Sequence, residues 1–178
     1  MFMWRAFFFA LIPVMGLAQE PDTVSPLIAF HMAGIICAPP TTGTSPAPDT
    51  IAGSTYLFDV EPDFVSTKRR VPAALGIGFG VKAQAANPLG IANLTMTITH
   101  PEMGELGTTS QSFSSNISGA NASLTFYQFD FDYELVTGVW QMEAASGADV
   151  LYRTTFEVLP PDQVPELAAI CDFAELLS

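Results

Sequence analysis

Apolar and polar side chains alternate most regularly between Gly138 and Val158, in the run GVWQMEAASGADVLYRTTFEV. A period of two residues is typical of a half-buried β-strand, because successive side chains point to opposite faces of a sheet. The alternation breaks at Ser146-Gly147-Ala148-Asp149, where small, turn-forming residues predict a tight turn. We therefore predict a β-hairpin whose buried face carries Trp140, Met142 and Ala144 on the first strand and Val150, Tyr152, Phe156 and Val158 on the second.

Other apolar or alternating runs predict further strands, separated by turn-forming residues. We expect Asn93–His100 to end at the His100-Pro101 step, because proline cannot continue a hydrogen-bonded ladder. About seven short strands predict an all-β fold, an immunoglobulin-like antiparallel β-sandwich with Trp140 as its core anchor. The other runs are Leu27–Cys37, Ser54–Val60, Val71–Gln84, an edge strand within 108–123, and Leu124–Glu134.

The Leu124–Glu134 run carries an acidic face. Phe129, Phe131 and Tyr133 alternate with Asp130, Asp132 and Glu134, so the carboxylates fall on one side of the predicted strand. Carboxylates about 6.6 to 6.8 Å apart along a strand could supply oxygen ligands to calcium. A solvent-facing acidic stripe explains them equally well, and the sequence has no D-x-D-x-D-G calcium loop. These three residues are a candidate binding group, and we predict no dedicated metal site or cofactor.

Both ends of the chain differ in character from its middle. Residues 1–18 combine Arg5, a short apolar run and a small-residue end, which predicts a signal peptide cut between Ala18 and Gln19. We expect residues 19–26 to be disordered, 27–158 to form the sandwich with a Pro-rich loop over 38–53, and 159–178 to form a tail. In that tail Asp162 could cap a short C-terminal helix whose apolar residues are Val164, Leu167, Ile170, Phe173 and Leu177.

The signal predicts a periplasmic or secreted protein with no membrane span left after cleavage. Cys37 and Cys171 are the only cysteines, and in an oxidising compartment an even pair is best interpreted as a disulfide. Such a bond would tether the tail to the first strand. Because the sequence has no C-x-x-C motif, redox catalysis is not expected.

The chain is acidic, with a net charge of −12. Removing Arg5 with the signal leaves 18 acidic and 5 basic residues, a charge of −13. This charge argues against nucleic acid and anionic membrane surfaces as partners. Lys68, Arg69 and Arg70 form the one cationic cluster; it could be an interaction patch for an anionic partner, or a solvated loop paired with nearby carboxylates.

Catalytic signatures are few. The sequence holds two histidines, His31 and His100, no G-x-S-x-G elbow and no H-E-x-x-H or H-x-x-x-H zinc pattern. A histidine on the apolar face of a strand, such as His100, is more often bonded to backbone than catalytic. We therefore predict no catalytic residues, and a hydrolase using His100 is the last of the alternatives.

Several segments together resemble a bacterial domain-of-unknown-function family, the one numbered 3859, which is found in exported proteins. They are VPAALGIGFGVKAQ, THPEMGELG from Thr99 to Gly107, the run YQFDFDYELVTGVWQMEA and the hairpin, all within about 27–158. The resemblance implies an immunoglobulin-like β-sandwich and no established activity, and it assigns no catalytic or binding residues.

These observations favour an exported, non-catalytic interaction or accessory domain with an unknown protein partner in the periplasm. A sandwich that binds a small molecule or calcium is the alternative, and the many aromatic residues leave room for an apolar cavity between the sheets.

Overall fold

The computed structural model describes residues 21–168, 170 and 171. The signal peptide predicted over 1–18, and Phe173 and Leu177 of the predicted helix, lie outside the described residues. Within the described part no helix is long and apolar enough to cross a membrane.

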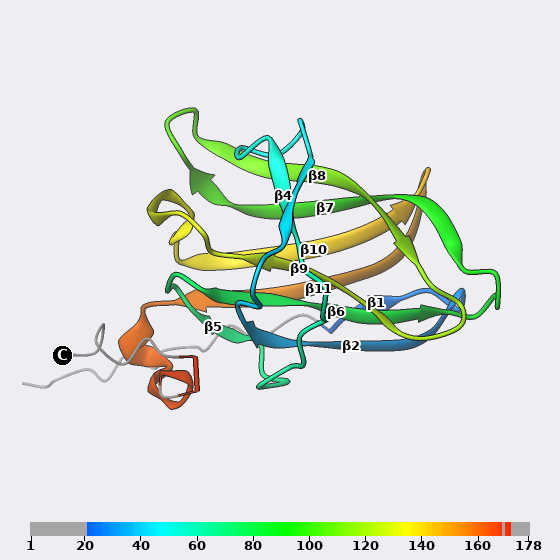
Figure 1. Ribbon diagram of the computed structural model, residues 1–178, viewed down its shortest axis with the longest axis horizontal. Coiled ribbons are helices and arrows are strands. Elements are labelled where there is room, and N and C mark those ends of the chain that lie inside the picture. Colours follow the sequence, from blue (N-terminus) through cyan, green and yellow to red (C-terminus); the bar gives the residue numbers. More distant parts are fainter. Residues whose placement is uncertain (1–20, 169, 172–178) are drawn as a thin grey trace, which may run out of the picture.

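Two antiparallel sheets face each other across an apolar core (Figure 1). The larger sheet has the order β1-β11-β10-β7-β8, and β5 pairs with β11 in parallel. The smaller sheet has the order β2-β6-β9. The larger sheet comprises β1 Thr23–Val24, β5 Arg70–Pro72, β7 Ile91–Met103, β8 Thr108–Ile117, β10 Gly138–Ser146 and β11 Asp149–Leu159; the smaller comprises β2 Ile28–Cys37, β6 Ile77–Ala85 and β9 Ser123–Gln128.

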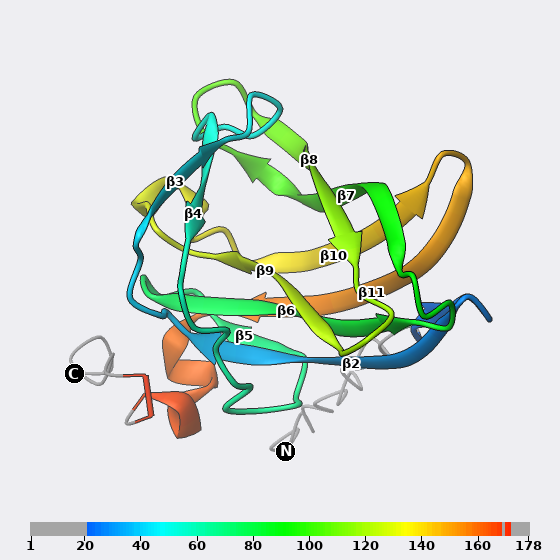
Figure 2. The same cartoon turned by 45° about the vertical axis from the view of Figure 1, so that its right-hand side comes forward.

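A third, two-stranded sheet closes one side of the sandwich. Strand β3, Gly43–Pro46, lies inside the Pro-rich loop predicted over 38–53, and it forms a hairpin with β4, Ser54–Leu57, which lies within the strand predicted over Ser54–Val60. Figure 2 shows this hairpin running from the side of β8 toward that of β9, across the gap where the two sheets are not joined. Three contacts fix it there: Ser112 N donates to Asp49 O, Ile51 N donates to Gln111 Oε1, and the rings of Phe58 and Phe126 pack together.

The predicted hairpin forms β10 and β11, with Gly147 at positive φ in the turn. Trp140 is fully buried and lies within 6 Å, centroid to centroid, of Phe79, Phe129 and Tyr127. Its indole N–H donates to Val136 O at 3.0 Å, so the polar atom of this side chain is satisfied inside the core.

Two elements near the middle and the end of the chain differ from the predictions. Strand β7 continues past His100-Pro101 to Met103, because its pairing with β8 is irregular between Thr99 and Met103 and the missing proline donor falls in that irregularity. Within the described residues, the predicted C-terminal helix is replaced by two 3-10 turns, Pro161–Gln163 and Pro165–Leu167. Each turn begins at a proline, which lacks the N–H that a continuing helix needs.

The prediction that residues 19–26 are disordered is also wrong for the second half of this segment. Residues 23–24 form β1 against β11, and Asp22 accepts two hydrogen bonds from the Arg69 guanidinium, at 3.0 and 2.7 Å. The bidentate bond and the short strand hold this segment on the larger sheet.

Close packing between strands makes Gly80 of β6 sensitive to substitution. A Cβ on Gly80 would clash with the backbone oxygen of Thr125 and lie 2.6 Å from Cβ of Phe126 on the neighbouring strand β9. We expect Gly80→Ala to lower the free energy of unfolding by about 1–3 kcal/mol, the usual cost of overpacking. Gly43→Ala is the matched control, because its Cβ would meet only Leu57 Cδ1 at 3.9 Å. Urea denaturation of both variants measures the difference; equal stability would contradict the close approach.

Candidate functional site

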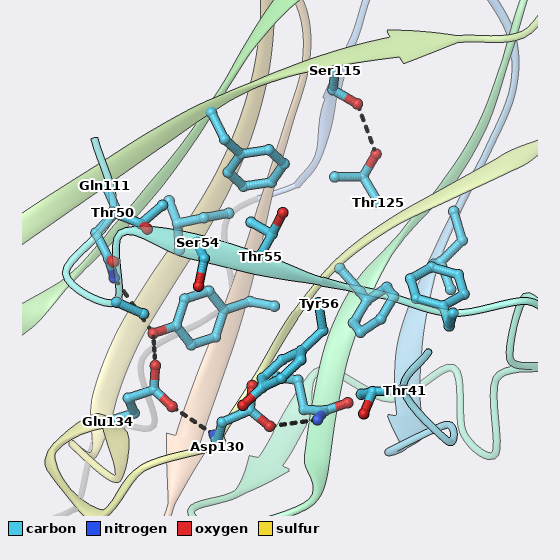
Figure 3. A pocket seen from close by; sticks show the side chains of 18 of the residues that line it. Thr41, Thr50, Ser54, Thr55, Tyr56, Gln111, Ser115, Thr125, Asp130 and Glu134 are labelled. Atoms are coloured by element: carbon cyan, nitrogen blue, oxygen red, sulfur yellow. Dashed lines mark hydrogen bonds between the residues drawn. The ribbon is translucent and has the colours of Figure 1, made fainter. Parts of the chain in front are cut away.

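A pocket of about 340 Å³ opens between β8 and β9, under the β3–β4 hairpin (Figure 3). Its wall combines residues from segments far apart in the sequence, which only the closing of the sandwich brings together. The lining is rich in aromatic rings and in serine and threonine hydroxyls, and it holds two carboxylates, Asp130 and Glu134. The rings belong to Tyr56, Phe58, Phe113, Phe126, Tyr127 and Phe131.

Glu134 is the most constrained polar residue of the pocket, with a side chain turned inward from a 3-10 turn, Asp132–Glu134. Its residue is 6% exposed. One carboxylate oxygen accepts a hydrogen bond from the Tyr127 hydroxyl at 2.7 Å, and the other accepts from the backbone N–H groups of Asp130 and Phe131 at 2.6 and 2.9 Å. Burial raises the pKa of Glu134, while these three donors oppose the rise.

These bonds explain why the acidic stripe predicted for Leu124–Glu134 is wrong. Strand β9 ends at Gln128, since the backbone N–H groups of Asp130 and Phe131 bond to the Glu134 carboxylate instead of a neighbouring strand. Asp132 is exposed and Glu134 is buried, so the carboxylates do not share one strand face. The geometry invoked for calcium is therefore not present, and among the described residues no three or more His, Cys, Asp or Glu side chains are grouped so that they could hold a metal ion.

Asp130 is half-buried beside Glu134 and lines the same pocket. Its carboxylate accepts a 2.6 Å hydrogen bond from Gln128 Nε2, and burial raises its pKa. Within the described residues, none of the ion pairs involves Asp130 or Glu134. The hydrogen bonds that these two carboxylates accept from the described residues therefore all come from neutral donors.

Gln111 connects the pocket to the core. Its amide nitrogen donates to the Tyr127 hydroxyl at 3.4 Å and lies 3.2 Å from His100 Nε2, while its oxygen accepts from Ile51 N at 2.8 Å. Burial, followed by the nearby Glu134 charge, raises the pKa of Tyr127, so this phenol stays protonated and donates to Glu134. A chain of hydrogen bonds therefore joins the hairpin loop, β8, β9 and the 3-10 turn.

Neither histidine belongs to the pocket lining. His100 is 4% exposed and its ring packs on Trp140. Nδ1 lies 2.8 Å from Pro101 O, which can only accept, so Nδ1 carries the proton and Nε2 can accept from Gln111. Burial lowers the pKa of His100, consistent with this neutral form.

His31 lies on β2, outside the pocket, where its side chain meets β11 of the other sheet and Asp22 of the N-terminal segment. Its Nε2 is 2.9 Å from Thr154 Oγ1 and its Nδ1 is 3.7 Å from Asp22 Oδ2. A histidine therefore lies near a carboxylate here. Its ring packs against Tyr152 of β11, and the Asp22 carboxylate is already paired with Arg69.

The cationic cluster of Lys68, Arg69 and Arg70 makes contacts within the chain. Lys68 Nζ pairs with Glu166 at 3.0 Å, Arg69 pairs with Asp22, and Arg70 donates to Gln163 O at 3.2 Å. Asp22, Gln163 and Glu166 belong to the two ends of the described chain, so the cluster holds these segments against the sandwich.

The disulfide Cys37–Cys171 is present, with an S–S distance of 2.06 Å. It joins the end of β2 to the turn that follows Leu167.

Sequence reasoning did not find Gln111, Tyr127 or Tyr56 as pocket residues. Gln111 stands in the Ser/Thr-rich stretch TTSQSFSS, where nothing in the pattern distinguishes a buried amide from an exposed one. Tyr127 and Glu134 are seven residues apart, a spacing with no motif attached to it.

Comparison with known proteins agrees with this architecture. Residues 26–158 match the family described as "Domain of unknown function (DUF3859)". Among solved structures, an immunoglobulin-like protein from Pseudomonas aeruginosa is similar, with 20% sequence identity and a TM-score of 0.51, covering 80% of this chain and 99% of its own. A search of curated proteins finds no match. The immunoglobulin-like β-sandwich predicted from the strand pattern is therefore confirmed.

Proposed function

The chain belongs to the DUF3859 family of immunoglobulin-like domains, and from that premise we propose that it is an exported, non-catalytic domain that binds a small molecule between β8 and β9. The observation that carries this proposal is the pocket itself. Its volume of about 340 Å³ lies within the range of small-molecule sites, about 300–1,000 Å³. Its lining also has the usual character of such sites, largely apolar and aromatic with a few polar groups fixed by hydrogen bonds.

Two further features support the proposal. The described pocket lining contains no histidine or cysteine, so it lacks the usual base and thiol of acyl transfer, which favours binding over catalysis. The Cys37–Cys171 disulfide is typical of proteins in oxidising compartments, which supports export to the periplasm or beyond.

A protein partner is the second candidate, because β8 and β9 are the outermost strands of their sheets. Among the described strands none pairs with their outer edges, although Ser112 N of β8 bonds to Asp49 O and Leu124 N of β9 bonds to the Glu61 carboxylate. An extended peptide could add as a further strand along the rest of either edge. This candidate and the pocket share one location, so one set of variants tests both.

Filling the pocket should abolish small-molecule binding. We expect at least one class in a panel of organic amines, neutral sugars, organic acids and fatty acids to raise the melting temperature of the mature protein in a saturable way. Ser54→Trp, on the pocket side of β4, should remove this shift, whereas Leu57→Trp should keep it, because Leu57 is 48% exposed and outside the lining. Thermal denaturation with each compound measures the effect.

Failure would take either of two forms. If no class of compound shifts the melting temperature, or if the shift survives Ser54→Trp with unchanged affinity, the pocket is not a small-molecule site. A protein or peptide that binds the wild-type chain and Ser54→Trp equally would then favour the outer edges of β8 and β9.

A further inference from the structure

The charged side chains that line the pocket are all acidic. Two acidic side chains line it, and its described lining contains no lysine, arginine or histidine. Outside the pocket most cations of the described chain pair with other carboxylates, as Lys82 does with Glu61 and Asp63, and none of the ion pairs of the described residues involves Asp130 or Glu134. An anionic ligand would therefore meet two like charges and no compensating group.

Keeping these carboxylates inside the fold costs free energy. A buried carboxylate held by neutral donors lacks the opposite charge that would offset its lost hydration. The raised pKa values of Asp130 and Glu134 express the same cost, because burial favours their neutral forms. A positive charge placed between the pocket wall and these acids would remove much of this cost.

The aromatic lining suits the same kind of ligand. The faces of aromatic rings carry negative potential and attract ammonium groups, most strongly where the cation is desolvated. Six rings line the pocket, from β4 and the residue after it, from β8 and β9, and from the segment after β9. Phe131 lies between the two acidic residues in sequence, and the Tyr127 hydroxyl donates to Glu134. Alkyl groups on a cation would contact these rings, while its charge would lie toward the carboxylates.

We propose that the pocket between β8 and β9 takes a small organic cation, a primary or quaternary ammonium compound, with its charge against Asp130 and Glu134. This inference rests on the proposed function and specifies its ligand class. No bond is made or broken in such binding. The acidic charge of the whole chain, −12, adds a longer-range attraction for cations approaching the opening.

A pair of compounds of the same shape separates charge from size. Choline is the cationic probe, and 3,3-dimethylbutan-1-ol is its neutral isostere, with a carbon in place of the quaternary nitrogen. For the wild-type mature protein, calorimetry should give choline an affinity about tenfold or more above that of the alcohol, which corresponds to at least one favourable charge contact.

Charge-neutralising variants locate the effect. Glu134→Gln keeps an oxygen for the Asp130 and Phe131 amides and a nitrogen that can donate to Tyr127, so the turn should persist. We expect Glu134→Gln and Asp130→Asn each to weaken choline binding about tenfold and to leave binding of the alcohol unchanged. Asp132→Asn is the matched control from the same segment, exposed and outside the lining, and should bind choline as the wild type does.

The outcomes distinguish this inference from the function beneath it. Equal affinity for choline and the alcohol, or equal choline affinity in Glu134→Gln, Asp130→Asn and Asp132→Asn, would overturn the cation assignment. Binding of a neutral sugar or an organic acid in the pocket, without choline binding, would overturn it as well while leaving a small-molecule site in place. If no compound of any class binds, both proposals fail.

Discussion

Replacing Trp140 by alanine should lower the free energy of unfolding by about 3–5 kcal/mol, the range for large-to-small changes at fully buried aromatic sites. The side chain contacts rings from both sheets and from the segment after β9, so its removal opens a void in the centre of the sandwich. The variant also leaves Val136 O without its 3.0 Å indole donor. Urea denaturation followed by far-ultraviolet circular dichroism measures the loss.

The neighbouring residue provides the control. Val139 precedes Trp140 on β10, points to the other face and is 59% exposed, so Val139→Ala should change stability by no more than about 0.5 kcal/mol. Trp140→Phe should fall between the two, because it keeps a ring in the core but loses the bond to Val136. Similar stability for Trp140→Ala and Val139→Ala would show that the core does not depend on this residue.

Removing the disulfide should be the second large effect. Cys37→Ala combined with Cys171→Ala is expected to lower the free energy of unfolding by about 2–5 kcal/mol, since the bond closes a loop across almost the whole domain and restricts the unfolded chain. Denaturation with and without a thiol reductant measures it. The reductant should bring the wild type to the stability of the double variant and leave that variant unchanged; a wild type insensitive to complete reduction would contradict the prediction.

Alternation along single strands predicted much of the architecture, because burial on one face of a sheet is imposed residue by residue. The hairpin of β10 and β11 illustrates this, with Trp140, Met142 and Ala144 all buried. Glycine also alternates with apolar residues along β6, and Gly80 has the backbone of β9 against it. These features depend on local pattern and on the simple requirement that apolar faces meet.

The pocket could not be predicted in the same way. The alternation from Phe129 to Glu134 would suit a longer β9. The strand ends earlier because the Glu134 carboxylate bonds to two backbone amides, and the period of the sequence gives no sign of this interaction. The site also depends on Gln111 meeting Tyr127 and Ile51, partners 16 and 60 residues away. The sequence grouped Asp130, Asp132 and Glu134 as candidates, whereas the folded chain brings Asp130 and Glu134 to the pocket and leaves Asp132 outside its lining.

The β3–β4 hairpin has a consequence of its own. It forms one wall of the pocket, yet it pairs with neither main sheet and is held at its loop by a few bonds to β8. Its exposed and pocket-facing residues can therefore be exchanged without changing the strands of the two main sheets. Selectivity for a guest molecule could then diversify within residues 43–57 while the scaffold that folds the protein stays the same.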